Sequence, residues 1–199
     1  MQPRRLELPW LPPAQLAPAL AQQWGADGLL WLDGDGSALG RWALLAVDPL
    51  EWVCCRGLPG EAGSRDPFAA LAALGPGHWC GWLSYEAAAW VEPAPHWRAD
   101  AMASLWIARH DPLLRFDLQE QRLWLEGHDP ARLQAMADWI AAFAQTNPPT
   151  PAAPLAAAAI PAEAWRWHTS PAAFAEGVRQ LRERIASGDL FQANLTACS

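Results

Sequence analysis

The sequence predicts an α+β fold, in which a strand-rich amino-terminal domain is flanked by helices. Short apolar runs alternate with turn residues between Gly28 and Glu126, a pattern typical of strands. Before and after this region, apolar residues recur with the 3.6-residue period of helices. Because strands and helices follow one another in blocks, the pattern indicates an α+β architecture.

The first helix is expected at Pro12–Gln23, where Leu16 and Leu20 share one face and proline stands in the first turn. Strands are expected at Gly28–Leu32, Trp42–Val47, Trp52–Cys55, Trp79–Tyr85, Ser104–Ile107, Leu113–Asp117 and Arg122–Glu126. The last two runs flank LQEQ and therefore indicate a hairpin.

Two further helices have clear start signals. Asp66 is a suitable N-cap with Pro67 at the first helical position, and Gly75 follows the end of this short helix. Asp129–Pro130 opens a longer helix in the same way. The apolar face of that helix comprises Leu133, Met136, Ala137, Ile140 and Ala144.

By composition the chain divides into three segments. Residues 1–145 carry the predicted strands and form one domain. Residues 146–162 are rich in Pro and Ala, and because prolines block regular pairing we expect a mobile connection there. Residues 163–199 begin a second domain with a helix that Ser170 caps and Gly188 ends. The apolar face of this helix comprises Phe174, Val178, Leu181 and Ile185.

From Leu190 the apolar period changes from that of a helix to that of a strand. Phe191, Ala193, Leu195 and Ala197 alternate with Gln192, Asn194 and Thr196. Because a strand needs a sheet, we expect residues 190–197 to belong to the sheet of a second domain that is truncated in this chain.

Composition excludes several classes of protein. The net charge of −7 argues against a nucleic-acid partner. No run of about 18 apolar residues is present, so no membrane partner is expected. The first residues lack the apolar core of a secretory signal, and we expect a cytoplasmic protein.

Cysteine, histidine and lysine usage limits the chemistry. Four cysteines form no CxxC pair and are expected to be free thiols. Five histidines lack metal-ligand spacing, so no metal site is expected. All 14 basic residues are arginine, which leaves no lysine nucleophile or Schiff base.

The segment Ser170–Thr196 closely resembles the entry to the chorismate-binding domain of anthranilate and aminodeoxychorismate synthase component I. In that family a helix ending in I-x-x-G-D leads into a strand of the form [IC]-[FY]-Q-V-[NV]-L-[ST]. The matching residues are Ile185, Gly188, Asp189, Phe191, Gln192, Asn194, Leu195 and Thr196, with Ala193 in place of the usual Val. Weaker similarity extends through Leu29–Pro49, Gly77–Pro93 and Leu105–Leu125.

This resemblance implies amination of chorismate with ammonia from a glutamine amidotransferase subunit or domain, in the presence of Mg²⁺. The family's P-I-K-G-T motif and acidic metal-binding stretches are absent, so no catalytic residue is assigned and no cofactor is expected for this chain. The pattern Gln192–Thr196 favours the aminodeoxychorismate branch over the anthranilate branch of tryptophan biosynthesis. The aminodeoxychorismate branch leads to 4-aminobenzoate and folate.

Related proteins hold a tryptophan in the amino-terminal domain. The resemblance places its contacts at Asp33, Gly34, Leu39, Gly40, Arg41 and Trp42. Asp33 and Arg41 would hold the ammonium and carboxylate of an amino acid, since arginine can grip a carboxylate with two hydrogen bonds. The alternative, which we favour, is a hairpin turn with Trp42 in the core. The fourteen tryptophans are likewise expected to fill the core.

The sequence thus predicts the amino-terminal part of an aminodeoxychorismate synthase component I-like protein, inactive by itself. Two alternatives come from another class of protein. One is a sensor that retains the amino-acid pocket, and the other is a non-catalytic module that docks onto an amidotransferase.

Overall fold

The computed structural model describes residues 3–150, 161 and 164–197. The chain forms two compact units, Met1–Ala152 and Ala153–Ser199, which are treated separately below. Most of the expected connection, at residues 151–160 and 162–163, lies outside the described residues. No helix in the described part is long and apolar enough to cross a membrane.

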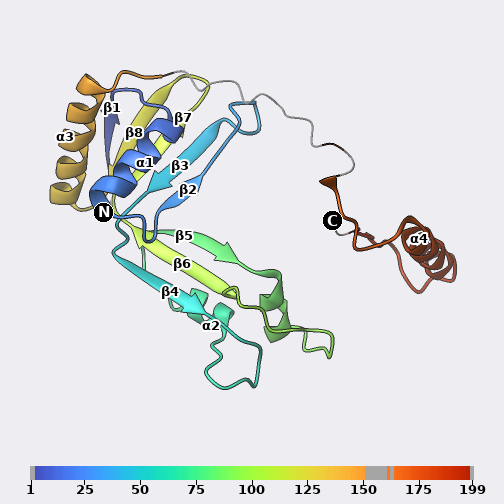
Figure 1. The fold of residues 1–199 in the computed structure, drawn as a ribbon. Coiled ribbons are helices and arrows are strands. Elements are labelled where there is room, and N and C mark those ends of the chain that lie inside the picture. The colour runs from blue at the N-terminus through green and yellow to red at the C-terminus, as the bar shows by residue number, and fades with distance from the viewer. Residues whose placement is uncertain (1–2, 151–160, 162–163, 198–199) are drawn as a thin grey trace. The chain divides into compact units, whose positions relative to one another are not determined.

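The first unit contains a five-stranded antiparallel sheet (Figure 1). Its strands, in spatial order, are Arg4–Leu8 (β1), Arg122–Gly127 (β8), Leu113–Asp117 (β7), Trp42–Ala46 (β3) and Leu30–Leu32 (β2). Each neighbouring pair is antiparallel, and β7 and β8 form the hairpin that the sequence predicts.

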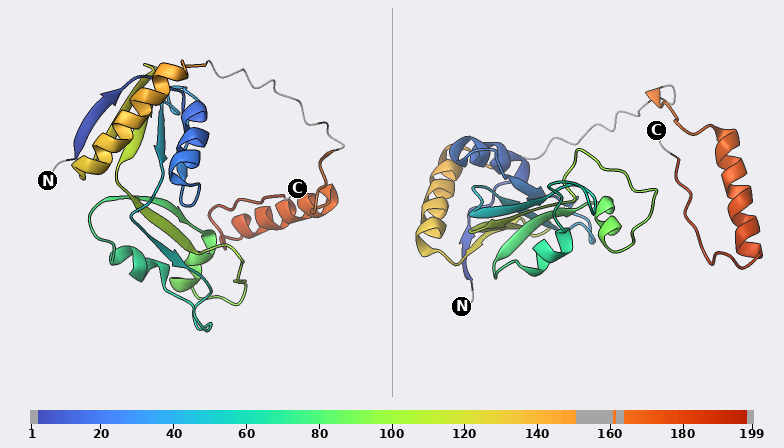
Figure 2. Two further views of the ribbon diagram at one scale, coloured as in Figure 1. Left: turned by 60° about the vertical axis from the view of Figure 1, so that its left-hand side comes forward. Right: turned by 90° about the horizontal axis from the view of Figure 1, so that it is seen from below.

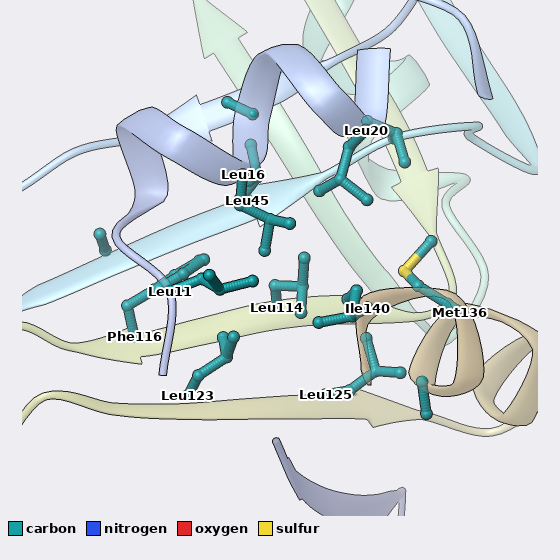
Figure 3. Packing of buried hydrophobic residues seen from close by; sticks show 14 of the residues in the cluster. Leu11, Leu16, Leu20, Leu45, Leu114, Phe116, Leu123, Leu125, Met136 and Ile140 are labelled. Carbon is teal, nitrogen blue, oxygen red and sulfur yellow. The ribbon is translucent and has the colours of Figure 1, made fainter. Parts of the chain in front are cut away.

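Two helices, Pro13–Trp24 (α1) and Pro130–Thr146 (α3), pack on one face of this sheet (Figure 2). The apolar residues that alternate along the strands meet the apolar faces of both helices, which forms the main core (Figure 3). Its largest fully buried side chains include Leu16, Leu20, Leu45, Leu114, Phe116, Leu123, Leu125 and Ile140.

A second antiparallel sheet in the same unit has three strands. They are Glu51–Cys55 (β4), Leu105–His110 (β6) and His78–Leu83 (β5), in that spatial order. A short helix, Pro67–Ala72 (α2), and a 3-10 helix, Tyr85–Trp90 (η1), belong to the same region. Cys55, Ala70 and Leu105 form its small core. These elements confirm the α+β fold class.

Helix starts agree with the local signals in the sequence. The carboxylate of Asp66 accepts hydrogen bonds from the amides of Phe68 and Ala69, and α2 begins at Pro67. Asp129 caps α3 in the same way. Satisfying otherwise unpaired amides in the first turn is what an N-cap does, so these starts depend only on neighbouring residues.

Two elements were not predicted. Strand β1 consists of RRLEL, whose charged residues and short length hide its alternation, and it lies at the edge of the sheet opposite β8. The 3-10 helix η1 begins at Tyr85, which was expected to end a strand, and continues through residues for which no element was predicted. Strand ends also shifted by one to three residues, for example at β6, which continues to His110.

The start of the expected connection is held by hydrogen bonds. The side-chain amide of Gln15 in α1 donates to the carbonyls of Asn147 and Pro148, at 3.2 and 3.1 Å, and its oxygen accepts the amide of Thr150 at 3.0 Å. The chain therefore stays against α1 for four residues after α3 ends, which the proline density alone did not predict.

The second unit contains Pro171–Ala186 (α4), whose start at Ser170 is confirmed by a hydrogen bond from the amide of Ala173 to the Ser170 hydroxyl. No residue of α4 is buried, and Val178 and Ile185 remain 37% and 41% exposed. Residues 190–197 form no strand here, because the described residues of the second unit contain no strand to pair with them.

Candidate functional site

The glycine-rich loop between β2 and β3, residues 33–41, carries most of the residues expected to contact an amino acid. Inside the loop, the amide of Gly36 donates to the carbonyl of Gly40 at 2.9 Å, which closes a tight turn. The amide of Ser37 donates to the carboxylate of Asp35, and the amide of Gly40 donates to the Ser37 hydroxyl. The loop is thus ordered by its own polar groups.

Close backbone approach explains the glycines at both ends of the loop. A Cβ atom on Gly34 would lie 2.3 Å from the Gly40 carbonyl oxygen and 2.7 Å from that of Trp42. A Cβ atom on Gly40 would lie 2.1 Å from the Asp35 carboxylate. Because real Cβ atoms do not approach other atoms so closely, the two arms of the loop can meet only without side chains at these positions.

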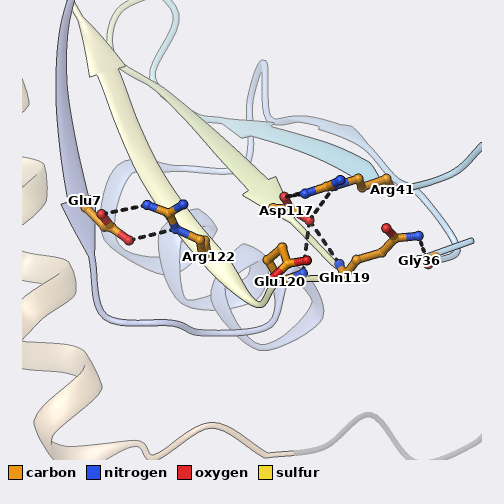
Figure 4. Close-up of polar contacts among 7 residues, drawn as sticks. All are labelled: Glu7, Gly36, Arg41, Asp117, Gln119, Glu120 and Arg122. Carbon is orange, nitrogen blue, oxygen red and sulfur yellow. Dashed lines mark hydrogen bonds and ion pairs between the residues drawn. The ribbon is translucent and has the colours of Figure 1, made fainter. Parts of the chain in front are cut away.

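Arg41 forms an ion pair with an acidic residue from the neighbouring strand (Figure 4). Its Nε lies 2.9 Å from both carboxylate oxygens of Asp117, and its Nη2 also donates to one of them. The hydrogen bonds from Arg41 lower the pKa of Asp117, and the same bonds raise the pKa of Arg41. Nε and Nη2 of Arg41 are therefore engaged in a structural ion pair, which leaves less of the guanidinium for a ligand carboxylate.

Asp117 also organises the β7–β8 turn. Its carboxylate, 2% exposed, accepts the amides of Gln119 and Glu120 at 3.1 Å. The side chain of Gln119 reaches back to the glycine-rich loop and donates to the carbonyl of Gly36 at 3.2 Å (Figure 4). Hydrogen bonds therefore join the glycine-rich loop to the β7–β8 turn at this end of the sheet.

The remaining expected contact residues differ in exposure and in their contacts. Leu39 is fully exposed at the apex of the loop, and the carboxylate of Asp33 accepts the amide of Gly34. Trp42 is 48% exposed, so the expectation that it fills the core is wrong. The reason is register: Trp42 pairs with Asp117 and so lies on the outer face of the sheet, opposite the helices.

The expectation that tryptophans fill the core is also wrong for several others. Exposed tryptophans include Trp31, Trp52, Trp82, Trp165 and Trp167. Trp124, by contrast, is only 7% exposed although, like Trp42, it lies on the face of the sheet opposite α1 and α3. The guanidinium groups of Arg5 and Arg122 lie 4.4 and 4.7 Å from its ring centroids, so two cation–π contacts cover it.

Arg122 in turn pairs with Glu7 on the edge strand, at 3.0 and 3.1 Å (Figure 4). Arg5 and Arg115 both pair with Glu126. Arginines and acids thus alternate across this outer face, and their charges nearly cancel. Within the ranges that the structure describes, no group of three or more His, Cys, Asp or Glu side chains could hold a metal ion.

Sequence comparisons place the chain among known proteins. A family model described as chorismate binding enzyme matches residues 52–199. An anthranilate synthase component I-like protein from Synechocystis sp. is 29% identical over 123 residues, which cover 60% of this chain. The chain spans about a quarter of that relative's length, since the aligned part is 24% of it.

Proposed function

The chain belongs to the chorismate-binding enzyme family, and from this premise we propose that it forms the amino-terminal part of a chorismate-aminating protein. The observation that carries the proposal is the extent of the family match, which runs from β4 through α4 to Ser199 and so includes residues of both compact units. The amination reaction itself is proposed for the whole protein rather than for these 199 residues.

We further propose that the product is aminodeoxychorismate, the precursor of 4-aminobenzoate. Support comes from the segment after α4, where Gln192, Asn194 and Thr196 follow the pattern of that branch. The anthranilate branch is the runner-up, and the name of the Synechocystis relative favours it. Because the two products differ, one assay separates the branches.

The described residues provide neither a lysine amine nor a Mg²⁺ site for the amination of chorismate. The chain has no lysine, so any covalent intermediate on a lysine side chain would have to form outside these 199 residues. The described residues hold no cluster suited to Mg²⁺, and we therefore derive no step through that ion. We propose that an amidotransferase partner supplies ammonia to the whole protein.

The test compares the complete gene product with the 199-residue chain. Each is incubated with chorismate, ammonium and Mg²⁺, and a lyase that releases 4-aminobenzoate is added to half of the samples. We expect 4-aminobenzoate from the complete product only, and neither product from the 199-residue chain. Anthranilate without 4-aminobenzoate would overturn the branch assignment. Turnover of chorismate by the 199-residue chain would overturn the proposal that amination needs the whole protein.

Tryptophan binding by the glycine-rich loop would support the alternative of an amino-acid sensor. Because Arg41 is held by Asp117, we expect no heat of binding when tryptophan is titrated into the 199-residue protein. Saturable binding that disappears in an Asp33→Ala variant, but not in Asp27→Ala, would favour the sensor instead.

A further inference from the structure

A polar cavity of about 250 Å³ lies in the first unit, outside the glycine-rich loop. It is lined by Pro76, Gly77, His78, Arg109, His110, Asp111 and His128. Three of the five histidines of the chain therefore meet here, from β5, from β6 and from the turn before α3. Sequence spacing could not show this, because sheet pairing brings the three segments together.

His110 is the most enclosed of the three, with no exposed surface. Its Nε2 lies 2.9 Å from the carbonyl oxygen of Gly28, so Nε2 carries the proton and donates. In the neutral ring, Nδ1 then bears a lone pair. This atom is buried and has no hydrogen-bond partner among the described residues. A second proton on the ring would be buried there, with only the backbone carbonyl of Ala108 to oppose the cost.

The surroundings of His110 contain no carboxylate bonded to its ring. His78 is its cross-strand partner, and the ring of His128 lies 5.8 Å from that of His78. The nearby charged groups are already paired: Asp111 accepts the amides of His128 and Asp129, Arg109 pairs with Glu51, and Arg132 pairs with Asp48. None of these groups bonds to the ring of His110, and the charge of Asp48 favours a protonated ring only from a distance.

His110 occupies the joint between the two sheets. It belongs to β6 of the three-stranded sheet, and its acceptor Gly28 precedes β2 of the five-stranded sheet. The apolar part of this joint is small, with Leu30, Ala46 and Leu113 buried and Leu44 and Cys80 packed against them. A polar contact therefore contributes a larger share of the joint's stability than it would in the main core.

We propose that His110 makes the joint between the two sheets acid-sensitive, so that mild acid opens this joint and loosens the strand ends that meet there, while β7 and β8 stay paired. Opening gives the ring access to water on both nitrogens. The protonated ring is then solvated by water in the open form and desolvated in the closed form, which shifts the equilibrium toward opening.

The direction of the effect follows from the two protonation equilibria. Burial lowers the pKa of His110 in the closed form, and the carbonyls of Gly28 and Ala108 and the charge of Asp48 oppose this only in part. In the open form the ring has its ordinary pKa of about 6.5. The joint is therefore fully stable above about pH 6.5 and weakens as the pH falls toward the closed-form pKa, with up to about a tenfold rise in the opening constant per pH unit.

Hydrogen exchange read by mass spectrometry tests the proposal. Protection factors, corrected for the intrinsic pH dependence of exchange, are compared at pH 7.5 and 5.5 for peptides covering residues 28–32 and 76–80. Peptides covering residues 123–127 serve as the internal reference. We expect protection at the joint to fall up to about tenfold across the pH unit below 6.5, with the reference unchanged.

Two variants identify the titrating group. His110→Gln keeps an N–H donor for Gly28 and cannot titrate, so its joint should show no such pH dependence. His96→Gln, in an exposed loop, should behave like the parent protein. Equal pH dependence in His110→Gln and the parent, or unchanged protection in the parent at both pH values, overturns the proposal.

A measurement on the parent protein keeps the test valid if His110→Gln does not fold. The ring resonances of His110 are followed by NMR across the same pH range. A pKa at or above about 6.5 in the closed protein contradicts the proposal, since no proton-linked opening would then arise. A pKa below that value, with opening at the joint, supports it.

Discussion

A matched pair of isoleucine-to-alanine substitutions tests whether the two long helices differ in packing as the structure indicates. Ile140 in α3 is fully buried in the main core, among residues such as Leu114, Leu125 and Met136 (Figure 3). Ile185 in α4 is 41% exposed, and no residue of that helix is buried. The same chemical change is thus made in two opposite environments.

The expected magnitudes follow from the carbons removed and from the space left behind. Each substitution deletes three carbons, at about 0.8 kcal/mol for each buried one. At Ile140 the surrounding core cannot collapse completely, so the cavity adds to this loss and we expect a total of about 2–5 kcal/mol. At Ile185 the side chain already meets solvent, and we expect a change within about 0.5 kcal/mol.

Urea unfolding followed by tryptophan fluorescence measures both changes, with far-ultraviolet circular dichroism as the second probe. The 199-residue protein is used in each case. A loss at Ile185→Ala as large as that at Ile140→Ala would show that α4 is packed against apolar surface in this chain. A loss below about 1 kcal/mol at Ile140→Ala would show that the main core is not packed as described.

Three further predictions concern local features. Asp129→Ala removes the cap of α3 and should lower the free energy of unfolding by about 1 kcal/mol. The control Asp138→Ala, on the exposed side of that helix, should change it little. Urea unfolding measures both changes. Gly34→Ala should destabilise the protein by about 1–3 kcal/mol, because the added Cβ atom would clash with a carbonyl oxygen of the loop. The control Gly75→Ala has open space around the added Cβ atom and should leave the melting temperature nearly unchanged. Deleting residues 187–199 should leave the melting temperature of the first unit unchanged, and a marked decrease would show that this segment belongs to its core.

Local signals in the sequence were enough to predict the main elements of the fold. The hairpin of β7 and β8 and the starts of α2, α3 and α4 agree with the structure. These features depend on residues within a few positions of each other, such as Asp129 with the amides of Ala131 and Arg132. The family resemblance likewise rests on short motifs and was confirmed by the match to residues 52–199.

The candidate amino-acid site was predicted only as a stretch of sequence, and its occupancy stays a prediction. The glycine-rich turn could be recognised from GDGSALG. That Arg41 is paired with Asp117 could not, because the two residues are 76 positions apart and meet only when β3 pairs with β7. The only sequence signal was the alternation on each strand, which gives the face of a residue but not its partner.

By itself, then, the sequence determined the α+β class, the helix caps, the glycine-rich turn and the family. The tertiary structure decided which face of the sheet Trp42 occupies, what holds Arg41, and that His78, His110 and His128 share one cavity. The physical reason is that caps and turns are satisfied by neighbouring amides, whereas strand order and register bring together residues that are distant in sequence.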